Sequence, residues 1–388
     1  MTRTAALHKS SARVSAPVLQ WAMVRVKSNH RDLAKSLGTS EAVVVQWFDG
    51  SGFPSFRQAR RLAEVLRVPF GFLFLREPPP DTLPIPDFRR LHGHEIGEIS
   101  PDLRDVIFAT LRRQAWLIER RETVGSSPVP VVGSMRGSQA VLHIATNIRR
   151  ALALGNRNAR PRNADEFLRL LVERSERLGI TVVRSGIVGL NTRRKLDVRE
   201  FRGFSLSDAL APFVFLNAAD AKTGQVFTLM HELTHIWLGQ SGISGSLRQS
   251  EGPTETLCNQ VAAEVLVPAS EFAQMWNGGA AVQEQIEAAA SFFRVSRYVI
   301  AIRAFESGFL DRPTLDELLD QYDVDSRGRP ASSGGDFYRT TIARNGKAFT
   351  EEVVSALGRQ QVLVREAASL LEVRPHHLER LGRELRGE

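Results

Sequence analysis

Two histidines interrupt an otherwise apolar segment at residues 224–238, GQVFTLMHELTHIWL. The segment predicts one buried helix, because no proline or internal glycine breaks it. His231 and His235 are four residues apart, so their side chains share one helix face and both imidazoles can reach a single ion. Buried His and Glu side chains cost free energy unless they hold something. The segment therefore predicts a metal site inside a folded domain.

A catalytic zinc ion keeps one position open for water and takes three protein ligands, so a third ligand is required. Glu255 is the best candidate, because it lies twenty residues past His235 on the next predicted helix, close to an Asn259 on the same face. Glu251 lies in a glycine- and serine-rich loop and Glu264 lies deeper in an apolar stretch, so both are weaker alternatives.

Glu232 follows the first histidine by one residue and is expected beside the ion, not bound to it. A zinc ion lowers the pKa of its water toward about 7, and a nearby carboxylate can take that proton and pass it to the leaving amine. The pattern predicts a zinc endopeptidase with Glu232 as its general base. Mn²⁺ or another divalent ion is the alternative metal.

A proline-rich run at residues 76–90, REPPPDTLPIPDFRR, cannot be helical and marks a domain boundary. With 388 residues, the chain is long enough for two or three domains. The expected organisation is a flexible tail at 1–15, a helix-turn-helix domain at 16–77, a connector and linking helix at 78–134, a peptidase domain at 135–275, a helical extension at 276–325 and a C-terminal domain at 326–388.

The peptidase domain is expected to be α+β. A predicted helix from residue 164 leads into strand-like ITVVRS, and FRGFSL and APFVFLN are two more candidate strands before the metal helix. This order favours an antiparallel sheet beside helices. The predicted fold class is a multidomain, mainly α chain with a zincin-like domain of gluzincin type and an all-α N-terminal domain.

Positive charge is concentrated at the start of the chain. Residues 1–77 hold twelve Lys and Arg against five Asp and Glu, and the net charge of the whole chain is +8. Such a block favours a polyanion partner. Residues 31–47 have helix-turn-helix spacing, with a small residue, a glycine and apolar positions at the expected intervals. DNA is therefore an expected partner, and the candidate contacts are Lys35, Ser40, Glu41, Gln46 and Arg57. Dimerisation or partner docking is the alternative role for this module.

Arg202 and Asp208 flank the predicted FRGFSL strand, whose edge is a candidate for pairing with an extended substrate. A structural ion pair is the plainer interpretation. Cys258 is the single cysteine, so no internal disulfide forms, and the first residues lack the apolar core of a secretory signal. Apolar stretches are too short to span a bilayer, so no membrane contact is expected and the cytoplasm is the predicted location.

Three segments resemble the metallopeptidases of the ImmA/IrrE family: FRGFSLSDALAPFVFLN, FTLMHELTHIWL and ETLCNQVAAEVLVP. The likeness runs in order from about residue 179 to residue 268. Residue by residue, the family's zinc ligands fall on His231, His235 and Glu255, and its general base falls on Glu232. The N-terminal segment ending in PFGFLFLREPPPDTLPIPDFR resembles the Xre-type helix-turn-helix that is often fused to this peptidase.

The resemblance implies a regulatory peptidase that cleaves a helix-turn-helix repressor in stress, mobile-element or phage-defence control. The substrate is a partner repressor, the chain's own N-terminal domain or another protein, and a homodimer is compatible with the sequence. The alternatives are a DNA-binding regulator whose zinc domain is a sensor or structural, and an antitoxin-like interaction protein.

Overall fold

The structure is a computed structural model. Its described residues fall into two compact units, each described by itself: residues 11–79 with 99–104, and residues 85–86 with 105–387. The described ranges are 11–26, 28–79, 85–86, 99–155, 161–244, 252–277, 279–326 and 336–387. Helices predominate, and no helix in these ranges is long and apolar enough to cross a membrane.

Short capped helices build the first unit: α1 (Ala16–Arg25), α2 (His30–Leu37), α3 (Glu41–Asp49), α4 (Phe56–Leu66) and the 3₁₀ helix η1 (Phe70–Phe74). Ser40 and Ser55 cap α3 and α4, because their hydroxyls accept hydrogen bonds from main-chain N–H groups of the first turn. Gly38 ends α2 with a φ of 67°, which a residue with a Cβ adopts only under strain. The helices enclose a core that includes buried Trp47 and Leu62.

A mixed sheet forms the centre of the second unit, with strand order β1-β5-β4-β6. Its strands are β1 (Thr181–Ser185), β4 (Gly203–Leu206), β5 (Phe213–Asn217) and β6 (Gly242–Ser244). β4 pairs antiparallel with β5 and β6, but β1 pairs parallel with β5, so the expected antiparallel sheet was wrong for β1. The cause is an excursion after β1 through the small β2–β3 sheet (Ile187–Val188, Asn191–Lys195), after which the β4–β5 hairpin returns β5 alongside β1.

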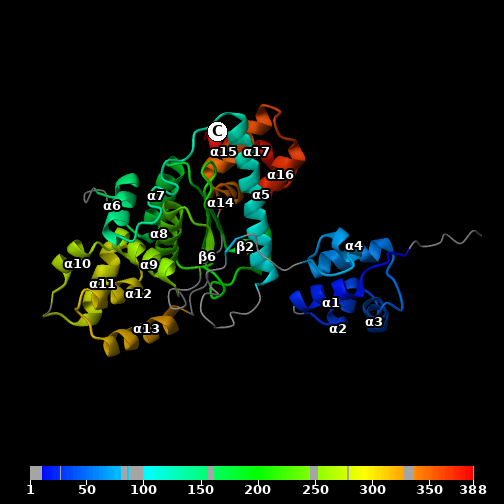
Figure 1. Ribbon diagram of the computed structural model, residues 1–388, viewed down its shortest axis with the longest axis horizontal. Coiled ribbons are helices and arrows are strands. Elements are labelled where there is room, and N and C mark those ends of the chain that lie inside the picture. The colour runs from blue at the N-terminus through cyan, green and yellow to red at the C-terminus, as the bar shows by residue number, and fades with distance from the viewer. Residues whose placement is uncertain are drawn as a thin grey trace, which may run out of the picture. The chain divides into compact units, whose positions relative to one another are not determined.

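Helix α8 (Lys222–Leu238) lies against strands β4 and β5 on one side and against helices on the other. The helices that contact it are α6 (Val141–Ala151), α7 (Ala164–Arg177) and α9 (Pro253–Leu266). Every residue of α8 from Gln225 to Leu238 is buried, because both sides are covered. The predicted apolar helix is therefore the central element of the unit (Figure 1).

Two further groups of helices complete the second unit (Figure 1). Helices α10 (Ala269–Met275), α11 (Val282–Phe293), α12 (Arg297–Glu306) and α13 (Arg312–Ser326) extend the core around α9. The second group is α14 (Phe337–Asn345), α15 (Lys347–Gly358), α16 (Val364–Leu370), η5 (Pro375–His377) and α17 (Leu378–Arg386), in which α14 packs on β1. From α5 (Pro101–Thr123), Arg113 reaches this second group, with a 3.0 Å ion pair to Glu372.

A mainly helical chain with an α+β unit is thus confirmed, whereas the expected domain limits stay a prediction. The strands predicted from ITVVRS, FRGFSL and APFVFLN correspond to β1, β4 and β5. β6 and helix α6 were not predicted, and β6 is important because it lies beside the candidate site.

Candidate metal centre

One turn of α8 brings two imidazoles together in the interior. His231 and His235 are 4% and 0% exposed, and their Nε2 atoms are 3.2 Å apart. At this distance at most one of the two nitrogens donates to the other, and with both rings deprotonated at Nε2 the two lone pairs would face a shared cation. The i,i+4 spacing in the sequence therefore produces the expected pair of facing nitrogens.

The third side chain comes from the first turn of α9. Glu255 is 1% exposed. One of its carboxylate oxygens lies 3.2 Å from the Nε2 atom of His231, and the other lies 3.0 Å from the Nε2 atom of His235. Glu264, an alternative ligand in the sequence, lies on the last turns of the same helix and pairs with Arg303 at 3.3 Å. The other alternative, Glu251, lies outside the described residues.

The three side chains fit a tetrahedral divalent ion. Ligand atoms about 2.0–2.1 Å from zinc in a tetrahedron are about 3.3 Å from one another. The closest separations here are 3.2 Å between the two Nε2 atoms, and 3.2 and 3.0 Å from these atoms to the two different carboxylate oxygens of Glu255. With one ligand atom taken from each residue, the three atoms lie within 4.8 Å of one another, and among the described residues this is the group of His, Cys, Asp and Glu side chains that meets that condition.

Two neighbours orient the first histidine. The Nδ1 atom of His231 is 2.8 Å from Oδ1 of Asn259, and its Nε2 atom is 3.1 Å from the hydroxyl oxygen of Ser244 on β6. A carbonyl oxygen beside Nδ1 places the proton there and leaves the Nε2 lone pair for a metal. Asn259 shares the ligand face of α9 as the sequence indicated, whereas no sequence signal points to Ser244.

Glu232 is fully buried beside the cluster. Among the described residues neither of its carboxylate oxygens has a hydrogen bond of normal geometry, although Ser205 and Ser244 lie close enough to influence it. Burial raises the pKa of Glu232 to about 8, with the charge of Glu255 acting in the same direction and His231 in the opposite one. A carboxyl group with a pKa near neutrality is suited to accept and return a proton.

The pKa values of the three candidate ligands shift in different directions. Burial opposes ionisation of Glu255, but the hydrogen bonds from both histidines outweigh it and lower its pKa below the usual range. Burial also opposes protonation of His231, yet contact with Glu255 raises its pKa, whereas burial lowers the pKa of His235. The carboxylate is therefore ionised at neutral pH, as a metal ligand must be.

The two residues proposed at the FRGFSL strand do not pair with each other. The Nη1 atom of Arg202 lies 3.0 Å from a carboxylate oxygen of Asp220, and burial raises the pKa of that carboxyl. Asp208 accepts hydrogen bonds from the N–H groups of Leu210 and Ala211, both at 2.8 Å. Both residues thus have structural partners, and their expected role in substrate binding stays a prediction.

The candidate DNA contacts all lie on the surface of the first unit, where Lys35, Ser40, Glu41, Gln46 and Arg57 are exposed. Ser40 also caps α3, and Glu41 pairs with Arg31 at 3.4 Å. Exposure is compatible with phosphate contacts, and DNA binding by these residues stays a prediction.

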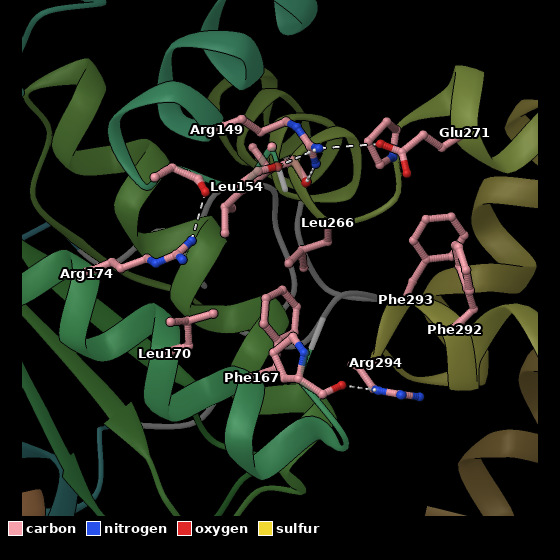
Figure 2. Close-up of a pocket in the computed structure, with 15 residues that line it drawn as sticks. Arg149, Leu154, Phe167, Leu170, Arg174, Leu266, Glu271, Phe292, Phe293 and Arg294 are labelled. Carbon is pink, nitrogen blue, oxygen red and sulfur yellow. Dashed lines mark hydrogen bonds and ion pairs between the residues drawn. The ribbon is translucent and has the colours of Figure 1, made fainter. Parts of the chain in front are cut away.

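A separate cavity of about 110 Å³ lies away from the metal centre and shares none of its residues (Figure 2). Its walls include Leu154, Phe167 and Phe293. The arginines around it are engaged with the main chain: Arg174 donates to the carbonyls of residues 152 and 153, and Arg294 donates to that of residue 161 (Figure 2). These contacts make the arginines ties between helices and loops, so the cavity adds nothing to the metal chemistry.

A buried cluster of two histidines from one helix and a glutamate from the next, beside a further glutamate, is the arrangement of a metallopeptidase of the HExxH type. Residues 175–305 match the family described as IrrE N-terminal-like domain (Peptidase_M78). The match contains the whole four-stranded sheet, α8 and α9, so the family resemblance is confirmed for this segment. No curated protein matches the chain.

Proposed function

We propose that the chain is a zinc-dependent endopeptidase. The observation that carries the proposal is the convergence of His231, His235 and Glu255 within 3.0–3.2 Å of one another, with the buried carboxyl of Glu232 alongside. A divalent ion held there supplies Lewis acidity that activates water at neutral pH. The match to a peptidase family makes the peptide bond the first candidate substrate.

The chain's own residues provide the remaining functions. Glu232 accepts the proton of the attacking water and returns it to the leaving amine nitrogen. Asn259 holds the ring of His231 in the tautomer that presents Nε2. The core around α8 and the sheet buries the cluster, and low solvent access strengthens electrostatic interactions at the site.

The physiological substrate proposed is a helix-turn-helix repressor or a similar protein, so that cleavage switches transcription. Two features support this regulatory role: the likeness of the HExxH region to ImmA/IrrE peptidases, and the basic N-terminal block that precedes the peptidase segment. DNA is the proposed partner of that block, and the cytoplasm is the proposed location.

The decisive experiment compares the wild type with Glu232→Gln in cells and in the purified full chain. The variant should bind zinc with nearly unchanged stoichiometry, because Glu232 is beside the ligands and not one of them, and it should produce no cleavage. Comparison of the two proteomes then identifies the cut protein as a fragment pair that only the wild type generates. Undiminished cleavage by Glu232→Gln would remove this residue from the mechanism.

A second function, DNA-binding regulation without proteolysis, is favoured by one observation. Lys35, Gln46 and Arg57 are exposed on the small helical unit whose sequence is strongly basic. The full-length Glu232→Gln protein separates the two functions: if it still regulates its target genes and protects an operator in footprinting, proteolysis is dispensable. Loss of regulation in Glu232→Gln together with loss of cleavage excludes this second function.

A further inference from the structure

The outer edge of β6 is the starting observation. β6 pairs with β4 on one side, with Ile243 opposite Phe204. The N–H of Ile243 points the other way and donates to the carbonyl oxygen of Pro86 at 3.1 Å. An edge strand presents unpaired N–H and C=O groups to a further strand. Here the carbonyl of Pro86 accepts a hydrogen bond from one of these N–H groups.

The residue before that proline is buried. Ile85 is 7% exposed, although the run 76–90 to which it belongs is mostly proline and charged residues. Withdrawal of an isoleucine side chain from water is favourable through the hydrophobic effect. One main-chain hydrogen bond therefore holds the segment on β6, and the side chain next to it is buried.

This contact lies next to the metal centre. Ser244 follows Ile243 directly on β6, and its hydroxyl oxygen is 3.1 Å from Nε2 of His231. A polypeptide that pairs with the outer edge of β6 therefore runs past the cluster of histidines and glutamates. Strand addition of this kind binds an extended chain through its main chain and selects it through pockets for alternate side chains.

We propose that the outer edge of β6 is the binding site for an extended polypeptide and that residues 85–86 of the chain itself occupy it at rest. The proposal rests on the proposed peptidase function and names the form of its substrate: an extended segment with an aliphatic side chain in the place of Ile85. The peptidase is self-blocked until this segment leaves. Because Pro86 has no N–H to give in return, a substrate strand with one gains a hydrogen bond that the segment lacks.

The first test measures amide hydrogen exchange at Ile243 in the metal-free full chain. Ile85→Asp removes the buried aliphatic group, whose burial is worth roughly ten- to hundredfold in an equilibrium constant. Exchange at Ile243 should rise by that factor, with a smaller rise in Ile85→Ala. Leu142→Asp, a matched change at a side chain that is 68% exposed on α6, should leave it unchanged. Equal exchange in Ile85→Asp and the wild type would overturn the proposal.

The second test measures binding of a fluorescein-labelled hexapeptide with the sequence of residues 83–88, Leu-Pro-Ile-Pro-Asp-Phe. Its affinity for full-length Ile85→Asp should exceed that for the wild type at least about tenfold, because the edge is released. A hexapeptide with Asp in place of Ile should not bind. Equal binding by the two proteins would refute self-occupation. Neither test needs metal or cleavage, so a failure of the peptidase function in the Glu232→Gln experiment remains distinguishable from a failure here.

Discussion

Gly203 lies where strand β4 passes closest to the candidate base, and Gly203→Ala tests this packing. A methyl group at this position would lie 2.7 Å from Cγ2 of Thr228, 2.9 Å from the carbonyl oxygen of Phe215 and 3.1 Å from Oε1 of Glu232. β4 cannot shift away easily, because Gly203 is paired with Leu216 on β5 and with Ser244 on β6. The substitution therefore strains both the sheet and its contact with α8.

Overpacking of this severity in a closed core costs about 1–3 kcal/mol. For domains of roughly 150–250 residues, 1 kcal/mol corresponds to roughly 2–4 °C in Tm, so the expected fall is about 2–12 °C. Differential scanning calorimetry of the metal-free chain measures it. Gly358→Ala is the control, since a methyl group there meets no atom within 4 Å and lies at the end of α15.

Removing the nearest atom should restore part of the loss. Thr228→Ser deletes the Cγ2 methyl that the new side chain meets at 2.7 Å, so the double variant should be more stable than the sum of the single effects predicts. Wild-type stability in Gly203→Ala, or strict additivity in the double variant, would show that β4 and α8 are not packed as described here.

Three further outcomes are expected. In competition titrations, Glu255→Gln should weaken zinc binding by more than the roughly 10–100-fold that is typical of losing a residue behind the ligands. Removing zinc from the wild type with a chelator should lower the free energy of unfolding by about 2.7 kcal/mol if zinc had been present at 100 times its Kd. Burial raises the pKa of Glu176 from 4.5 to about 7, so the folded chain holds this proton more tightly and loses stability as pH rises from 4.5 to 7. In urea unfolding, the free energy of unfolding of Glu176→Gln should exceed that of the wild type by up to about 3 kcal/mol at pH 8 and equal it at pH 4. Asn147→Leu removes the 2.8 Å acceptor of the indole N–H of buried Trp237, and chemical denaturation should show a loss of about 1–3 kcal/mol.

Helices were predictable wherever the sequence holds its own start and stop signals. The sequence FRQARRLAEVL of α4 is an example: Ser55 and Gln58 form a reciprocal capping box, and the apolar positions recur at helical spacing. β6 gave no such signal. It has three residues, too few to show an alternation, and its partner β4 lies more than thirty residues earlier in the chain.

Some residues of the candidate site could likewise be predicted from local sequence, and others could not. Helix geometry alone places His231 beside His235, because residues four apart share a face. The third ligand depends on which end of α9 faces α8, which no local pattern encodes. In the structure the first turn of α9 faces the histidines, and Glu264, about two and a half turns later, pairs with Arg303 instead. Ser244 has no local signal at all, since β6 reaches the cluster only through its pairing with β4.

The free-energy cost of burying these ionisable side chains indicates that they serve a function other than stability. Four ionisable side chains, His231, Glu232, His235 and Glu255, are at least 96% buried, and groups of this kind are more stably replaced by apolar residues of similar size. The surrounding core offsets the cost with close apolar packing, including Phe204 and Phe215 stacked at 5.0 Å on the adjacent sheet. Stability therefore cannot be the reason for placing these groups together, whereas a divalent cation held there would compensate the charge of Glu255. Because its ligands come from both α8 and α9, such a cation would also link the two helices, so its binding should stabilise their contact.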